Sequence, residues 1–113
     1  MNQTSPEARV GSGVVGTNIV VTLNAGETSP WIPVSPSTMV ACIPGSGTTM
    51  KAQVSWSPLS VLLADNLNST SNANAFDWTP GAVTSKAKEL QTNANGVRFV
   101  ATGGAGGVGE LAR

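Results

Sequence analysis

Hydrophobic and polar residues alternate most regularly between residues 50 and 57. The two alternating sets are Met50, Ala52, Val54 and Trp56 on one side and Lys51, Gln53, Ser55 and Ser57 on the other. A period of two places each set on one face of an extended chain, so this segment is predicted to be a half-buried strand with Trp56 in the core. Pro58 is expected to end the strand because proline has no backbone N–H to donate.

Three other segments of the chain also have the composition of strands. Short apolar and β-branched runs at 18–23, 38–43 and 97–102 predict three more strands. Residues 83–92 favour a strand over a single helical turn at 86–90, and Asn95-Gly96 is typical of a type I′ hairpin turn.

The remaining segments predict irregular structure or strand edges. The proline-rich segment 28–36 fits a sheet edge that leads into a core strand. A second apolar run at 59–63 precedes the polar residues 65–75, which are expected to form an exposed loop. No segment predicts a helix of about ten residues or more.

These elements predict an all-β fold. Six to eight short strands, separated by turn signals about every 8–12 residues, favour an antiparallel β-sandwich or small jelly roll with flexible terminal arms. We expect an N-terminal arm at 1–17, a β-sandwich domain at 18–102 and a Gly-rich C-terminal tail at 103–113. The aromatic residues expected in the core are Trp31, Trp56, Trp78, Phe76 and Phe99.

Composition narrows the possible functions. The 113 residues suffice for one domain, and six basic and six acidic side chains give a net charge of zero. This balance argues against nucleic-acid binding by phosphate neutralisation, and no apolar run is long enough to span a membrane. Charged residues make up only 11% of the chain, which favours a protein held in a larger assembly. The first residues lack the pattern of a secretory signal, so synthesis in the cytoplasm is expected.

Candidate chemistry is sparse. The chain has no histidine, which excludes Ser-His-Asp and Cys-His catalysis, and its single cysteine, Cys42, is interpreted as a small buried hydrophobic residue. Asp65 and Asp77 are the only acidic pair expected at one end of the sandwich. With Asn66 and Asn68 they could supply oxygens to a calcium ion, but the spaced carboxylates of a calcium loop are missing. We therefore expect a protein that is not an enzyme, with no metal and no cofactor.

Three segments together resemble small virion proteins. They are Thr28 to Pro36, Ala52-Gln53-Val54-Ser55-Trp56-Ser57 and the closing run Gly96 to Gly104. In style and strand order they are similar to capsid decoration (cement) proteins of tailed double-stranded DNA phages. This resemblance implies a β-sandwich or jelly roll that self-associates, binds the major capsid protein and lies on the outer capsid surface of the virion.

In such a protein the terminal segments are expected to make the contacts between subunits. The candidate interface residues are Val10, Val14, Val15, Val108 and Leu111. The alternative is a carbohydrate-binding or tail/baseplate β-module of a phage adhesion apparatus. In that interpretation Trp31, in the proline-rich segment, stacks on a sugar ring.

Overall fold

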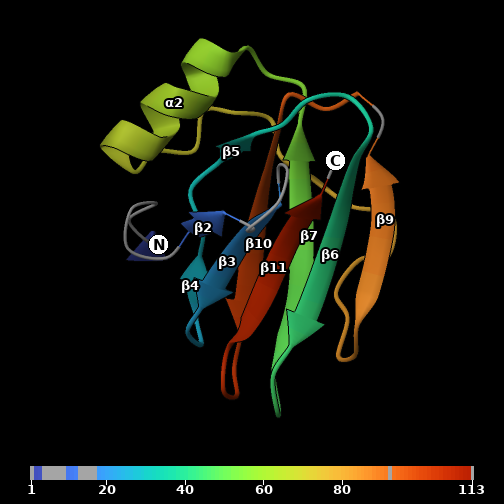
Figure 1. The fold of residues 1–113 in the computed structure, drawn as a ribbon. Coiled ribbons are helices and arrows are strands. Elements are labelled where there is room, and N and C mark those ends of the chain that lie inside the picture. The colour runs from blue at the N-terminus through green and yellow to red at the C-terminus, as the bar shows by residue number, and fades with distance from the viewer. Residues whose placement is uncertain (1, 4–9, 13–17, 92, 113) are drawn as a thin grey trace.

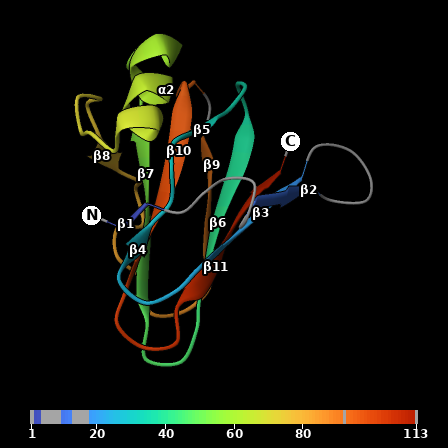
Figure 2. The ribbon, with the colours of Figure 1, turned by 90° about the vertical axis from the view of Figure 1, so that its left-hand side faces the viewer.

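The computed structural model describes residues 2–3, 10–12, 18–91 and 93–112. Two β-sheets pack face to face, with a helix at one end (Figures 1 and 2). Sheet A contains, in spatial order, β1 (Asn2–Gln3), β4 (Glu27–Thr28), β10 (Gly96–Thr102), β7 (Thr49–Ser55) and β8 (Phe76–Asp77), and β5 (Ile32–Pro33) also pairs with β10. Sheet B contains β2 (Val10–Ser12), β3 (Ile19–Leu23), β11 (Gly107–Ala112), β6 (Thr38–Pro44) and β9 (Ala87–Gln91).

The predicted all-β, antiparallel sandwich is confirmed. Neighbouring described strands run antiparallel, apart from the two-residue pairing of β1 with β4. Six of the described strands have five residues or more, and these six carry most of the pairing. The ambiguous segment at 83–92 contains β9, so the strand interpretation was correct.

The core lies between the two sheets because five of the six long strands present mainly apolar residues to it; the exception is the edge strand β9, where Glu89 and Gln91 are in register with buried residues of β6. Its buried residues in the long strands come from five of these strands: Val21 and Leu23 in β3; Val40 and Cys42 in β6; Met50, Ala52 and Val54 in β7; Val97, Phe99 and Ala101 in β10; and Leu111 in β11. Phe99 lies against Gly109 of the facing sheet, where an added Cβ would meet the Phe99 ring. The glycine therefore makes room for the largest fully buried side chain.

Three connections between the sheets lie at the end shown at the bottom of Figure 1. The turns after β3, β6 and β10 each lead from one sheet to the other. Backbone hydrogen bonds join two of these turns, from Gly45 N to Gly106 O (2.8 Å) and from Ala105 N to Ser46 O (3.0 Å). The Thr48 hydroxyl donates to Gly103 O (3.0 Å) and accepts from Gly106 N (2.9 Å), so this end of the sandwich is closed by the chain itself.

The opposite end carries a helix that the sequence did not predict. Helix α2 spans Leu59–Asn68, so the expected apolar run at 59–63 and the start of the expected loop at 65–75 are one continuous element. Leu62 and Asp65, three residues apart, are its buried side chains, and Ser69 ends it with a φ of 52°. An apolar run of this length fits a strand or a helix equally well, which explains the error.

The expected hairpin at Asn95-Gly96 is also wrong. β9 and β10 lie in different sheets, and Gly96 is the first residue of β10. A glycine suits this position for another reason: a Cβ there would lie 2.6 Å from Leu62 Cδ1, so the buried Leu62 side chain would have to shift. Helix α2 therefore packs closely on the backbone at the start of β10.

The terminal segments differ from the expected arms. Residues 107–112, assigned to a flexible C-terminal tail, form β11, which pairs with β3 on one side and β6 on the other. In the N-terminal segment, residues 2–3 pair with β4 and residues 10–12 pair with β3. Of the described residues in these terminal segments, 2–3, 10–12 and 107–112 are therefore parts of the two sheets, and 103–106 form the turn between β10 and β11.

Three of the five aromatic residues expected in the core are there. Phe99, Trp31 and Trp78 are at most 3% exposed, whereas Trp56 and Phe76 are 46% and 55% exposed. The alternation along β7 is correct, but Trp56 comes one residue after the strand ends at Ser55. It therefore lies at the rim of the sandwich, in edge-to-face contact with Phe76.

Candidate binding surface

The outer side of sheet B is unusually apolar. Alternation along its strands turns one residue in two away from the core, and the registers align these residues in rows across β3, β11, β6 and β9. We call them the sheet B face: Val20, Thr22, Met39, Ala41, Ile43, Lys88, Leu90, Val108, Glu110 and Ala112. Seven of the ten are apolar, and all ten are half-buried or exposed.

The strand β6 contributes most to the apolar character of this face. β6 is apolar at Met39, Ala41 and Ile43 as well as at its buried positions, so both of its sides are apolar. In Figure 2 sheet B lies on the right, and no described helix or strand covers its outer side. Six of the seven apolar side chains are half-buried and Leu90 is exposed, while Glu110 and Lys88 flank Ala41 in the middle row. Exposed apolar patches are common at interaction sites, which makes this face a candidate.

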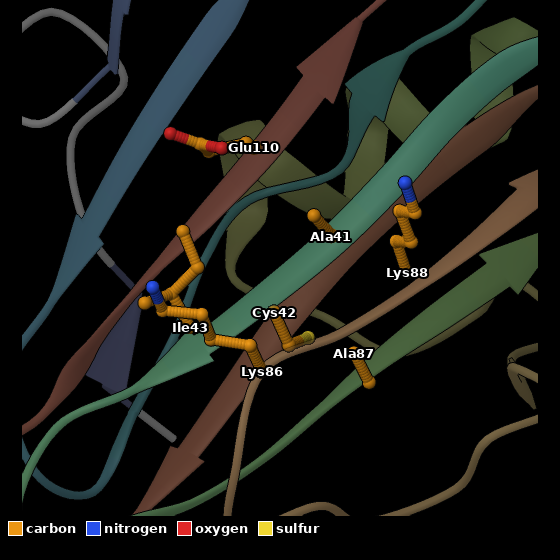
Figure 3. Close-up of a pocket in the computed structure, with 7 residues that line it drawn as sticks. All are labelled: Ala41, Cys42, Ile43, Lys86, Ala87, Lys88 and Glu110. Carbon is orange, nitrogen blue, oxygen red and sulfur yellow. The ribbon is translucent and has the colours of Figure 1, made fainter.

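A shallow groove of about 410 Å³ crosses this surface (Figure 3). Its lining residues come from β6, β9 and β11 and from the residue before β9: Ala41, Cys42, Ile43, Lys86, Ala87, Lys88 and Glu110. Lys88 belongs to β9, Lys86 comes directly before it, and Glu110 belongs to β11. Among the described residues, Lys86, Lys88 and Glu110 form no ion pair. The groove thus combines an apolar floor with two lysines, of which Lys86 extends toward Ile43 and Lys88 points away from it (Figure 3).

A second, smaller feature lies at the rim of the sandwich. The indole Nε1–H of Trp56 donates to Asn93 Oδ1 (3.0 Å), and the Phe76 ring lies 5.7 Å away at an interplanar angle of 67°. Asn95 Nδ2 donates to the carbonyls of Trp56 and Ser57 (3.1 Å each). These contacts hold an exposed tryptophan in one orientation beside side-chain amides.

Trp31 does not form an exposed platform. Its side chain is only 2% exposed, and the Arg98 guanidinium lies over its ring, 4.5 Å from the centroid. Asn66 fixes its backbone, accepting from Trp31 N (2.6 Å) and donating to Trp31 O (2.7 Å). Trp31 is therefore a structural anchor between β5 and α2, and the expected glycan-stacking role at this residue is wrong.

The candidate interface residues fall into three groups. Val108 faces outward within the sheet B face, as an interface residue should. Leu111 is 2% exposed and belongs to the core, so it cannot make the expected contact between subunits. Val10 lies in β2, and Val14 and Val15 lie outside the described residues.

Asp65 and Asp77 are engaged separately. Asp65 is 1% exposed, and it accepts hydrogen bonds from Thr70 Oγ1 (2.6 Å), Ala73 N (2.7 Å) and Asn72 N (3.1 Å). Burial opposes ionisation, but these donors outweigh it and hold the pKa of the Asp65 carboxyl below its usual value. Asp77 accepts from Gln53 and from Lys51, and both bonds lower the pKa of its carboxyl.

Neither carboxylate forms part of a metal cluster. The two asparagines grouped with them make local contacts: Asn66 binds Trp31, and Asn68 Nδ2 donates to Ala64 O (3.1 Å). Within the described ranges, no three Cys, Asp, Glu or His side chains come together as a possible metal site. Cys42 is fully buried, as expected, and burial raises the pKa of its thiol to about 12.

The chain matches no known family model, no curated protein and no solved structure. In the described part of the chain, no helix has the length and hydrophobicity needed to cross a lipid bilayer. The candidate sites therefore rest on the geometry of this molecule alone.

Proposed function

We propose that this protein is a structural, non-enzymatic component of a larger protein assembly, which it binds through the sheet B face. The observation that carries this proposal is the row pattern of seven apolar side chains on the outer side of a four-strand surface. The resemblance of the sequence to capsid decoration proteins suggests the assembly: the outer surface of a tailed-phage capsid, with the major capsid protein as partner.

Charge indicates what the partner surface should carry. Lys86 and Lys88 border the apolar groove and have no acidic partner among the described residues. A partner with one or two carboxylates beside an apolar patch would complement them, because a charge-assisted hydrogen bond is stronger than one between neutral groups. Repetition of such a contact over a lattice would multiply a modest affinity for a single site.

A matched pair of variants tests the proposal. Val108 lies on the outward side of β11, and Val100 lies at the corresponding outward position of β10 in sheet A; both are half-buried. Val108→Asp places a carboxylate in the proposed interface and should lower occupancy at least tenfold. Val100→Asp introduces the same charge on the other sheet and should leave occupancy unchanged.

The readout is cosedimentation of the purified variants with particles of the phage whose genome encodes this chain. Circular dichroism and thermal melts confirm that both variants remain folded. Equal binding by Val108→Asp and wild type would refute a role for the sheet B face. Failure of the wild type to sediment with the particles would refute the capsid assignment.

The aromatic rim supports one alternative function, the binding of a carbohydrate. Trp56 and Phe76 expose about half of their side chains, and the amide groups of Asn93 and Asn95 are adjacent. Sugar rings stack on such aromatic faces and hydrogen-bond to neighbouring amides. Binding on a glycan array that is lost in Trp56→Ala and kept in Val108→Asp would favour this function over the first.

A further inference from the structure

Helix α2 exposes an apolar ridge formed by Leu59, Leu63 and Leu67, which we call the α2 ridge. These side chains are 47%, 48% and 86% exposed. A spacing of four residues places them along one side of the helix, while Leu62 and Asp65 are buried on the side that meets the sandwich. The ridge is therefore directed away from the chain's own core.

The ridge does not hold the helix in place. The helix is held from its buried side, by the Asn66 amide on the Trp31 backbone and by the Asp65 carboxylate on Thr70, Asn72 and Ala73. Because a helix of ten residues is marginal in water, these tertiary contacts supply most of its stability. Polar residues at the ridge positions would serve the fold equally well.

The exposed side of α2 also carries no charge. Asp65 is the only ionisable residue between 59 and 68, and it is buried. The other exposed residues of the helix are Ser60, Ala64 and Asn68. In a two-fold dimer, groups near the axis meet their own copies, so any charge there would face a like charge. An uncharged apolar ridge flanked by small residues avoids this repulsion and suits a second copy of the same chain.

The exposed apolar area at this end of the molecule is close to what a dimer interface needs. β8, which begins with Phe76, and the end of β7, one residue before Trp56, lie at the same end of the sandwich as α2 (Figure 2), and the two rings are in edge-to-face contact. Their exposed halves and the three leucines together offer roughly 400 Å² of apolar surface per chain. A standard interface buries about 800 Å² per partner, somewhat more than half of it apolar. One end of the molecule thus provides most of the apolar area that a dimer needs.

We propose that α2 is a self-association surface, at which the ridges of two copies pack across a two-fold axis. Rows of side chains spaced by four residues interdigitate best when the helices cross at about −50°, with axes about 8–10 Å apart. This inference goes beyond the proposed function because it uses the end of the sandwich and leaves the sheet B face free.

Sedimentation velocity of the purified full chain over a range of concentrations tests the proposal. The wild type should shift from 11.4 kDa toward twice that mass as the concentration rises. Leu63→Glu should raise the dissociation constant at least tenfold. Leu90→Glu is the matched control, because Leu90 is also 48% exposed but lies on β9, and it should leave dimerisation unchanged. A wild type that stays monomeric at several hundred micromolar, or a dimer lost only in Leu90→Glu, would overturn the proposal.

Cysteine cross-linking tests the geometry independently. Ala64 is exposed on α2 beside the ridge, and Ala25 is exposed in the turn after β3, at the far end of the sandwich. Under mild oxidation Ala64→Cys should form a disulfide-linked dimer and Ala25→Cys should not. The native Cys42 does not interfere, because it is fully buried. Efficient cross-linking through position 25 with none through position 64 would place the contact elsewhere and refute the α2 assignment.

Discussion

The outer sides of the two sheets differ in what their side chains bind. On sheet A, Lys51 pairs with Asp77 (3.2 Å), Gln53 donates to Asp77 (3.0 Å), and Arg98 donates to Gln53 (2.8 Å) and stacks on Trp31. On sheet B the corresponding outward residues are mostly apolar, and Lys86, Lys88 and Glu110 have no ion pair among the described residues.

Surface residues of the two sheets therefore differ in role: those of sheet A contribute to folding, and those of sheet B are proposed to contribute to binding. The polar network of sheet A joins β7, β8, β10 and the segment before β5, so its bonds contribute to folding. Lys88 and Glu110 of the sheet B face form no ion pair among the described residues, which agrees with the binding role proposed for this face. Substitutions on the two surfaces should therefore change different quantities: unfolding free energy for sheet A and binding for sheet B.

The largest expected effect is at Trp31, below the sheet A network. Trp31→Ala removes a side chain that is 98% buried and should lower the unfolding free energy by about 3–5 kcal/mol. Trp56→Ala, at the exposed rim, should cost less than about 1 kcal/mol. Urea denaturation measures both values, and similar losses would contradict the assignment of one tryptophan to the core and the other to the rim.

Asp65 is the centre of a separate group of hydrogen bonds, which joins α2 to the residues that follow it. Asp65→Asn replaces an acceptor of three hydrogen bonds with a group that also donates, so it should cost about 2 kcal/mol at pH 7. The folded-state pKa lies below the usual value of 3.8, so the stabilisation by Asp65 is complete above about pH 5 and is lost as the pH falls through the folded-state pKa. Unfolding curves between pH 7 and pH 2.5 should show a smaller pH dependence in Asp65→Asn than in the wild type.

A smaller effect is expected for Arg98, in the middle of the sheet A network. Arg98→Ala removes the cation stacked on Trp31 and the hydrogen bond to Gln53, which should cost about 1 kcal/mol. Thermal unfolding of Arg98→Ala and Arg98→Lys would separate stacking from charge alone. Full stability in Arg98→Ala would show that the network does not contribute to folding.

The smallest effect on stability is expected on the sheet B face. Ile43→Thr keeps a β-branched side chain at an outward position and should change the unfolding free energy by no more than about 0.5 kcal/mol. The same variant should reduce binding to particles. A stability loss as large as that of Trp31→Ala would mean that the sheet B face belongs to the folded core.

The strands were predictable where one side of each faces the core and the other faces water. The alternation in β7 located a true strand, but it could not show that the sheet ends before Trp56. In α2, leucines spaced by four and a neighbouring Leu62 look like the continuous apolar run of a strand, since helix and strand patterns coincide over five residues. Only the tertiary contacts of Asp65 and Asn66 distinguish them.

The candidate surface was predictable in part. Val108 was expected at an interface, although for a different reason, since it was assigned to a tail. The apolar run from Met39 to Ile43 does signal a strand that is apolar on both sides, but the sequence alone does not show which side is covered. Gly107 and Gly109 predicted flexibility, whereas in the structure they allow Met50 and Phe99 to pack against β11.

The position of β11 in sheet B determines when the sheet can be completed during synthesis of the chain. It is the last described strand along the chain, yet it lies between β3 and β6 and is the sole link between the two halves of sheet B among the described strands. Until β11 has been synthesised, β3 and β6 cannot be joined in one sheet. The core residues Val21, Val40 and Phe99 therefore stay exposed to solvent during translation. A chain truncated before residue 107 would lack the strand that joins β3 to β6, and its exposed apolar residues would make it a substrate for chaperones and proteases.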